Sequence, residues 1–94
     1  VTAVLALSYP KSKGRISLRG PDPDLPPRIE LSMLDHPDDI ATLVRALRVV
    51  REVFRQPAFA RHSLGERIPG AEVDSDAALE TYVRATCWPT NHPM

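Results

Sequence analysis

Prolines set the strongest limit on what this chain can fold into. Ten of its 94 residues are proline, and each one fixes φ and removes a backbone hydrogen-bond donor. The stretch Gly20–Pro27 holds four of them and cannot form a helix or a strand. The prolines lie between segments with regular hydrophobic patterns, so they predict rigid connections between short elements and not a disordered chain.

The first part of the chain has the pattern of β-strands. Val1–Tyr9 is aliphatic with little polar alternation, which predicts a strand covered on both faces. Pro10–Gly14 is typical of a turn, and Arg15–Arg19 then alternates polar and apolar residues like a half-buried strand. Together they predict an antiparallel β-hairpin over Val1–Arg19, with Arg28–Leu31 as a short extended segment beside it.

A long amphipathic helix is the clearest element in the sequence. His36 or Asp35 stands at the N-cap position, and Pro37 suits the first helical position. Asp38 and Asp39 favour the positive end of the helix dipole. Apolar residues three and four apart then form one stripe, which consists of Ile40, Leu43, Val44, Leu47, Val50 and Phe54. The pattern predicts one helix with a single buried face.

A second, shorter helix follows after an irregular stretch. Pro57 ends the long helix, Ala58–Pro69 shows no regular period, and the step to Gly70 indicates a turn. The second helix is expected over Ser75–Cys87, with Asp74 or Ser75 at its start. Its buried side is expected to hold Leu79, Tyr82, Val83 and Thr86 or Cys87. Strands first and helices afterwards predict an α+β fold.

Charge and cysteine content exclude several classes of function. Twelve basic and twelve acidic side chains cancel, so no long-range field attracts nucleic-acid phosphates or an anionic membrane. The single cysteine, Cys87, cannot form an intramolecular disulfide, which favours a reducing compartment and a cytoplasmic location. No apolar run approaches the roughly 20 residues of a membrane helix. We therefore expect neither a nucleic acid nor a membrane as partner.

The spacing of the possible metal ligands argues against a metal site. They are His36, His62, Cys87 and His92, which stand 26, 25 and 5 residues apart. Because a zinc site needs close ligand pairs, no metal is expected. Cys87 on an apolar helix face fits a small buried hydrophobe better than a thiol nucleophile. No G-x-S-x-G motif supports a Ser-His-Asp triad.

Charged and aromatic side chains on the helices have mainly structural interpretations. The long helix carries arginines three and four residues apart, which are Arg45, Arg48, Arg51 and Arg55. Glu52 interrupts this series in a neutral chain, so a solvated face is favoured over a phosphate site. Tyr82 is expected in the core, whereas Trp88 fits either the core or the wall of a substrate cavity.

Short motifs along the whole chain resemble those of glucose-methanol-choline oxidoreductases, in the order and at the spacing of that family. Tyr9–Ile16 resembles the family's P-x-S-x-G-x-[VI] hairpin, and His92–Pro93 resembles the HP-x-G-T-C motif that carries its active-site histidine. Further matches lie between these two, at Asp22–Ile29, His36–Ile40, Leu47–Arg48, Pro69–Gly70, Ser75–Asp76 and Leu79–Glu80. The ordered set, more than any single motif, carries the resemblance.

The resemblance implies a larger parent enzyme. That parent would bind FAD in an N-terminal Rossmann-like domain and oxidise a primary or secondary alcohol by hydride transfer to the flavin. Residues 1–94 would be a fragment of its substrate-binding, C-terminal domain that ends at the active-site histidine. The FAD domain of the parent would be the partner of this fragment and a small-molecule alcohol its substrate. The fragment alone is expected to be inactive.

The resemblance also implies roles for the last residues. His92 would be the catalytic base that takes the hydroxyl proton, a task that suits an imidazole because its ordinary pKa lies near 6.5. Asn91 would bind the cofactor and Thr90 the substrate. Two alternatives stay open. One is a lyase of the same family that uses the histidine without net redox chemistry, and the other is a stand-alone α+β interaction module without catalysis.

Overall fold

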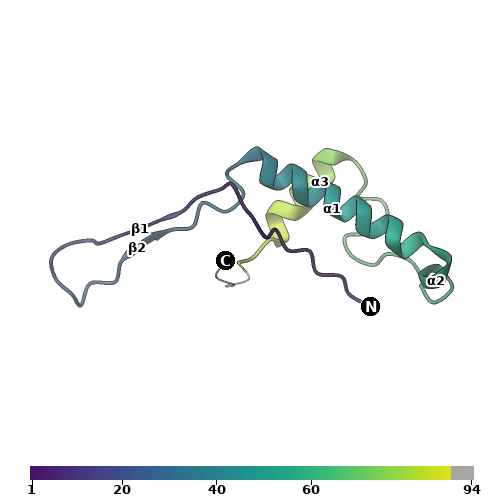
Figure 1. The fold of residues 1–94 in the computed structure, drawn as a ribbon, viewed down its shortest axis with the longest axis horizontal. Coiled ribbons are helices and arrows are strands. Elements are labelled where there is room, and N and C mark those ends of the chain that lie inside the picture. Colours follow the sequence, from purple (N-terminus) through teal and green to yellow (C-terminus); the bar gives the residue numbers. More distant parts are fainter. Residues whose placement is uncertain (90–94) are drawn as a thin grey trace.

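The computed structural model of the chain describes residues 1–89 and has an elongated shape, 61 × 24 × 20 Å along its principal axes. A thin two-stranded ribbon projects from one end of a small helical body (Figure 1). In chain order the elements are β1 (Arg15–Ser17), β2 (Arg28–Glu30), α1 (Pro37–Arg55), α2 (Pro57–Ala60) and α3 (Asp76–Thr86). An antiparallel sheet with one long and one shorter helix confirms the predicted α+β class.

The sheet pairs different segments from those predicted. β1 and β2 run antiparallel with Ile16 opposite Ile29, so Arg28–Leu31 supplies the second strand and the predicted hairpin over Val1–Arg19 is wrong. The turn at Pro10–Gly14 does not join two paired strands. The proline-rich stretch between β1 and β2 forms the connecting loop, as its lack of donors requires.

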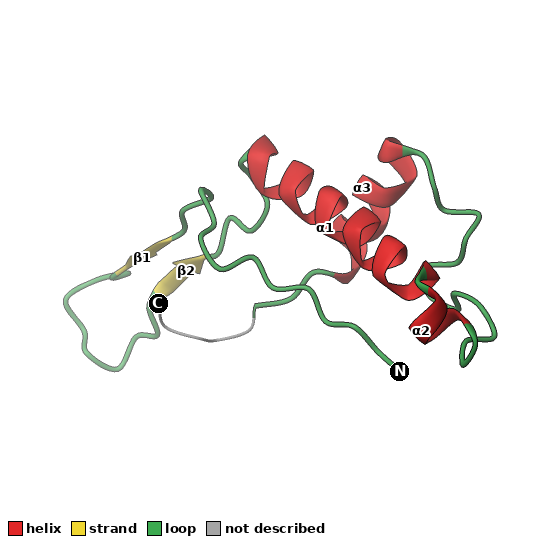
Figure 2. Cartoon of the chain, turned by 45° about the vertical axis from the view of Figure 1, so that its right-hand side comes forward, coloured by secondary structure: helices red, strands yellow, loops and turns green. Residues whose placement is uncertain are grey.

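The first residues, Val1–Tyr9, are extended but form no strand within residues 1–89. They run beside the helical body (Figure 2), where Leu5 and Leu7 pack against its core. Val1 and Val4 are largely exposed, so the prediction of a strand covered on both faces is wrong for the described part of the chain. An apolar segment becomes a strand only when another backbone supplies hydrogen bonds.

The ribbon has one apolar and one polar face, because side chains alternate along a strand. Ile16 and Ile29 share the apolar face and stay 72% and 59% exposed. Arg28 and Glu30 form an ion pair of 2.7 Å. A Cβ at Gly14 would collide with the carbonyl oxygen of Glu30, so only glycine allows this close approach. An isolated two-stranded ribbon is marginally stable in water, so its apolar face suits further packing.

Helix α1 begins and ends where its sequence predicts. The His36 ring accepts a hydrogen bond through Nδ1 from the Asp38 N–H at 3.2 Å, and Pro37 occupies the first turn. The helix stops at Arg55, and the following proline opens the short α2. This one-turn helix was not predicted within the irregular stretch that follows α1.

The core lies where α3 crosses α1 (Figures 1 and 2). Leu79 of α3 is fully buried, and the other buried apolar side chains of the described residues surround it: Leu34, Ile40, Leu43, Val44 and Val83. Tyr82 and Cys87 are half-buried against this cluster, which confirms their predicted core side. Phe54, at the far end of the predicted stripe, instead meets Phe59 of α2 edge to face at 5.4 Å.

A buried carboxylate ties the first turn of the chain to the start of α1. Asp39 is 2% exposed and accepts hydrogen bonds from the backbone N–H groups of Lys11 and Ser12, both at 2.8 Å. The Ser12 hydroxyl also donates to this carboxylate and accepts from the His36 N–H. The bond from the Lys11 N–H, followed by that from Ser12, lowers the pKa of Asp39. We call this group the Asp39 clamp.

Truncation of Leu79 to alanine tests the core. The change leaves a cavity at the helix crossing and should weaken the packing of α3 by about 2–5 kcal/mol. In the full-length protein that carries this segment, amide exchange within α3 should accelerate by about 30-fold or more, at about 1.4 kcal/mol per tenfold. Leu64→Ala is the matched control, because Leu64 is fully exposed. Equal exchange in both variants would contradict this core.

Acid should release the Asp39 clamp. A carboxyl whose pKa is lowered in the folded state stabilises that state above its ordinary pKa of 3.8. The contribution is lost as the pH falls through the lowered value. NMR of the full-length protein that carries this segment should show the Lys11 and Ser12 amide signals shifting together in this acidic range. Asp39→Asn should abolish the titration, and Asp38→Asn should preserve it; the reverse pattern would rule the clamp out.

Candidate functional site

The three residues with predicted site roles, Thr90, Asn91 and His92, lie outside the described residues, and their roles stay predictions. The described chain leads up to them through the end of α3. The Cys87 N–H donates to the Val83 carbonyl at 2.9 Å and closes the helix. Trp88 follows and is 63% exposed, which places it outside the core of residues 1–89.

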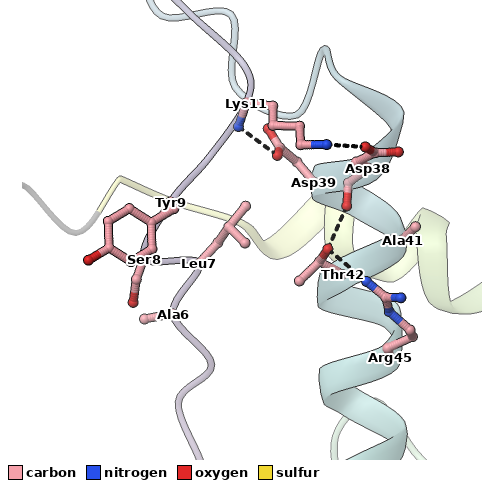
Figure 3. Close-up of a pocket in the computed structure, with 10 residues that line it drawn as sticks. All are labelled: Ala6, Leu7, Ser8, Tyr9, Lys11, Asp38, Asp39, Ala41, Thr42 and Arg45. Carbon is pink, nitrogen blue, oxygen red and sulfur yellow. Dashed lines mark hydrogen bonds and ion pairs between the residues drawn. The ribbon is translucent and has the colours of Figure 1, made fainter.

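A shallow groove of about 600 Å³ lies between the first segment of the chain and the N-terminal half of α1. Figure 3 shows the first segment on one side and Asp38, Thr42 and Arg45 of α1 on the other, with the Lys11 side chain reaching across to Asp38. The Asp39 clamp fixes the distance between these two sides, because it joins the turn after Tyr9 to the first turn of α1.

The charged side chains of the groove already make hydrogen bonds within the protein. Lys11 Nζ lies 2.5 Å from Asp38, which raises the pKa of Lys11 and lowers that of Asp38. Arg45 donates to the Thr42 hydroxyl at 3.2 Å, and this hydroxyl donates to the Asp38 carbonyl at 2.7 Å. The carboxylates and cations of the groove are thus held in bonds within the protein, and we assign it no chemistry of its own.

The described residues show no group of three or more His, Cys, Asp or Glu side chains that could hold a metal ion. His36 caps α1, and the exposed His62 accepts a hydrogen bond from Arg61 at 3.0 Å. Likewise, no helix within residues 1–89 combines the length and the apolar character that a membrane span requires.

Arg51 corrects the prediction that the arginines of the long helix form a solvated face. Its side chain is only 9% exposed and forms a bidentate ion pair with Glu66, with both N–O distances at 2.9 Å. It also donates to the Asp74 carboxylate at 3.2 Å and to the carbonyl oxygens of Gly70 and Val73 at 3.2 and 2.9 Å. We call these groups the Arg51 cluster.

Sequence patterns held a partial signal for this cluster. Arg51 stands four residues after Leu47 and seven after Val44, so it lies on the apolar stripe and not on the opposite face. A charge on such a stripe indicates a buried partner. Arg48 lies nearer the surface, donates to Asp76 at 2.6 Å and has a raised pKa because of that bond.

Comparison with known proteins supports the motif resemblance. A model of the family described as GMC oxidoreductase matches residues 10–94. The alcohol dehydrogenase (acceptor) of Pseudomonas putida is 34% identical over 85 residues, which cover 90% of this chain and 15% of that protein. An oxygen-dependent choline dehydrogenase of Stenotrophomonas maltophilia is 37% identical over 82 residues, or 87% of this chain and 15% of that protein.

A third relative is named for a reaction other than alcohol or choline oxidation. The chloroplastic fatty acid photodecarboxylase of Chlamydomonas reinhardtii is 36% identical over 86 residues, which cover 92% of this chain and 14% of that protein. The chain thus spans about 15% of the length of these relatives. Because the family model matches all but the first nine residues, the chain belongs to the GMC oxidoreductase family.

Proposed function

We propose that residues 1–94 are part of the substrate-binding, C-terminal domain of an FAD-dependent alcohol oxidoreductase. The observation that carries the proposal is the family match, which runs through residues 10–94 and includes His92. Two of the similar proteins are named as alcohol and choline dehydrogenases. The substrate would be a primary or secondary alcohol, and the setting a reducing, cytoplasmic one.

In this proposal His92 is the catalytic base. A bound flavin supplies the acceptor for the hydride that leaves the carbinol carbon. His92 takes the hydroxyl proton as the carbonyl forms, so that the alcohol loses one hydride and one proton. A neutral imidazole is available for this step near neutral pH. Thr90 would contact the substrate, and Asn91 would contact the cofactor.

The described residues do not themselves form a cradle for FAD. The cations of the groove, Lys11 and Arg45, are engaged with Asp38 and Thr42, and the sequence has no G-x-G-x-x-G fingerprint. The proposal therefore assigns most of the FAD contacts to the FAD domain of the parent. What the described part supplies is a fixed helix, α3, immediately before the proposed contact residues.

Flavin reduction in the full-length protein that carries this segment tests the proposal. Anaerobic mixing with a panel of small alcohols should bleach the oxidised flavin, and His92→Gln should slow this reduction by about 10²- to 10⁴-fold, the usual contribution of a general base. His62→Gln is the matched control, because His62 is exposed, and its reduction rate should stay unchanged.

Other outcomes distinguish the alternatives. A full-length protein that holds no flavin would refute the proposal. A flavin that no alcohol reduces, together with His92-dependent product formation, would favour a lyase of the same family. Measuring both flavin reduction and product formation is necessary because one relative is named as a photodecarboxylase, and membership in the family alone does not fix the reaction.

A further inference from the structure

The Arg51 cluster joins α1 to the segment that leads into α3. Its guanidinium is nearly fully buried, and its partners lie 15 to 23 residues further along the chain. Within the described residues no buried side-chain nitrogen or oxygen lacks a hydrogen-bond partner, so the buried charge is fully compensated. Gly70 contributes its carbonyl from a positive φ of 101°, a conformation that favours glycine.

The cluster ends directly at the start of α3. Asp74, which accepts from Arg51, precedes Ser75, whose hydroxyl caps the helix by accepting from Ala78 at 3.2 Å. Arg48, one turn before Arg51 on α1, donates to the Asp74 carbonyl at 2.9 Å and to Asp76. Arg48 therefore bonds the first turn of α3, and Arg51 bonds the residues just before this helix.

Apolar packing alone would fix the position of α3 along α1 less sharply than directional hydrogen bonds do. The contact of Leu79 and Val83 with α1 is apolar and carries no directional bond. A bidentate guanidinium–carboxylate pair is directional in both distance and orientation. Near the other end of α3, Arg84 reaches the Leu34 carbonyl at 3.4 Å, which is a long hydrogen bond. Arg51 and Arg48 thus add directional bonds at the start of α3 to the apolar packing of this helix on α1.

We propose that Arg51 is a positioning residue for the C-terminal segment: its buried guanidinium fixes the loop that leads into α3, and through it the place where the chain leaves α3 at Cys87. The inference rests on the proposed function of His92 as base. α3 ends at Thr86, six residues before His92 in the sequence. A helix transmits a shift at its first turn to its last turn, since each residue adds a fixed rise of about 1.5 Å.

Kinetics of the full-length enzyme test this proposal. Arg51→Lys keeps the charge but loses the planar fork. It should lower the rate of flavin reduction per bound flavin by about 10-fold, within the ~10²-fold that a 1 Å misplacement can cost. KM is expected to rise as well, because Thr90, the proposed substrate contact, belongs to the same C-terminal segment. Arg55→Lys is the matched control, because Arg55 is exposed and, within residues 1–89, pairs only with Glu52 on its own helix.

If Arg51 only stabilised the fold, Arg51→Lys would have different effects. In that case Arg51→Lys would lower the melting temperature or the flavin content, while each remaining flavin would be reduced at the wild-type rate; this result would overturn the proposal. Glu66→Gln provides a second variant if Arg51→Lys fails to fold. It leaves Arg51 in place, weakens its bidentate pair and should also slow reduction per flavin. Wild-type rates in Glu66→Gln would count equally against the inference.

His92→Gln in the same assay separates this inference from the proposed function. If His92→Gln is slow and Arg51→Lys is normal, only the positioning role of Arg51 fails. If His92→Gln keeps the wild-type rate, the proposed base itself is wrong, whatever Arg51→Lys does.

Discussion

Buried charges must find their partners inside the protein, and α1 places one near each of its ends. Asp39 in the first turn binds the N-terminal turn, and Arg51 near the C-terminal end binds the loop that leads into α3. Each group is satisfied by several donors or acceptors, which makes its burial tolerable. The ribbon and α3 therefore take their positions from opposite ends of one helix, with the Leu79 core between them.

Local signals made the helices predictable, and long-range contacts made the rest unpredictable. Pro37, the cap at Ser75 and the apolar stripes lie within the elements that they define, so the sequence alone located α1 and α3. The pairing of β1 with β2 depends on backbone hydrogen bonds across a loop, which the apolar pattern of Val1–Tyr9 could not reveal. A pattern of apolar residues predicts which side of a segment is buried better than it predicts which other segment packs or pairs with it.

The candidate site divides in the same way. His92 was identified only through the order of family motifs, because a lone histidine carries no pattern of its own. The sequence predicted Asp39 as a residue that favours the positive end of the helix dipole. Its hydrogen-bond partners lie 27 and 28 residues earlier in the chain, which is too far for a local pattern to indicate. The result is a scaffold in which the buried Asp39 and Arg51 hold the elements, and the proposed base, His92, follows α3 by six residues in the sequence.

A crystal structure of the full-length protein with flavin and a bound alcohol tests the central claim most directly. We predict that an imidazole nitrogen of His92 lies within about 2.6–3.2 Å of the alcohol oxygen, with the carbinol carbon facing the flavin. The Arg51–Glu66 pair should remain buried in that structure. A His92 ring that points away from a substrate bound at the flavin would contradict the account.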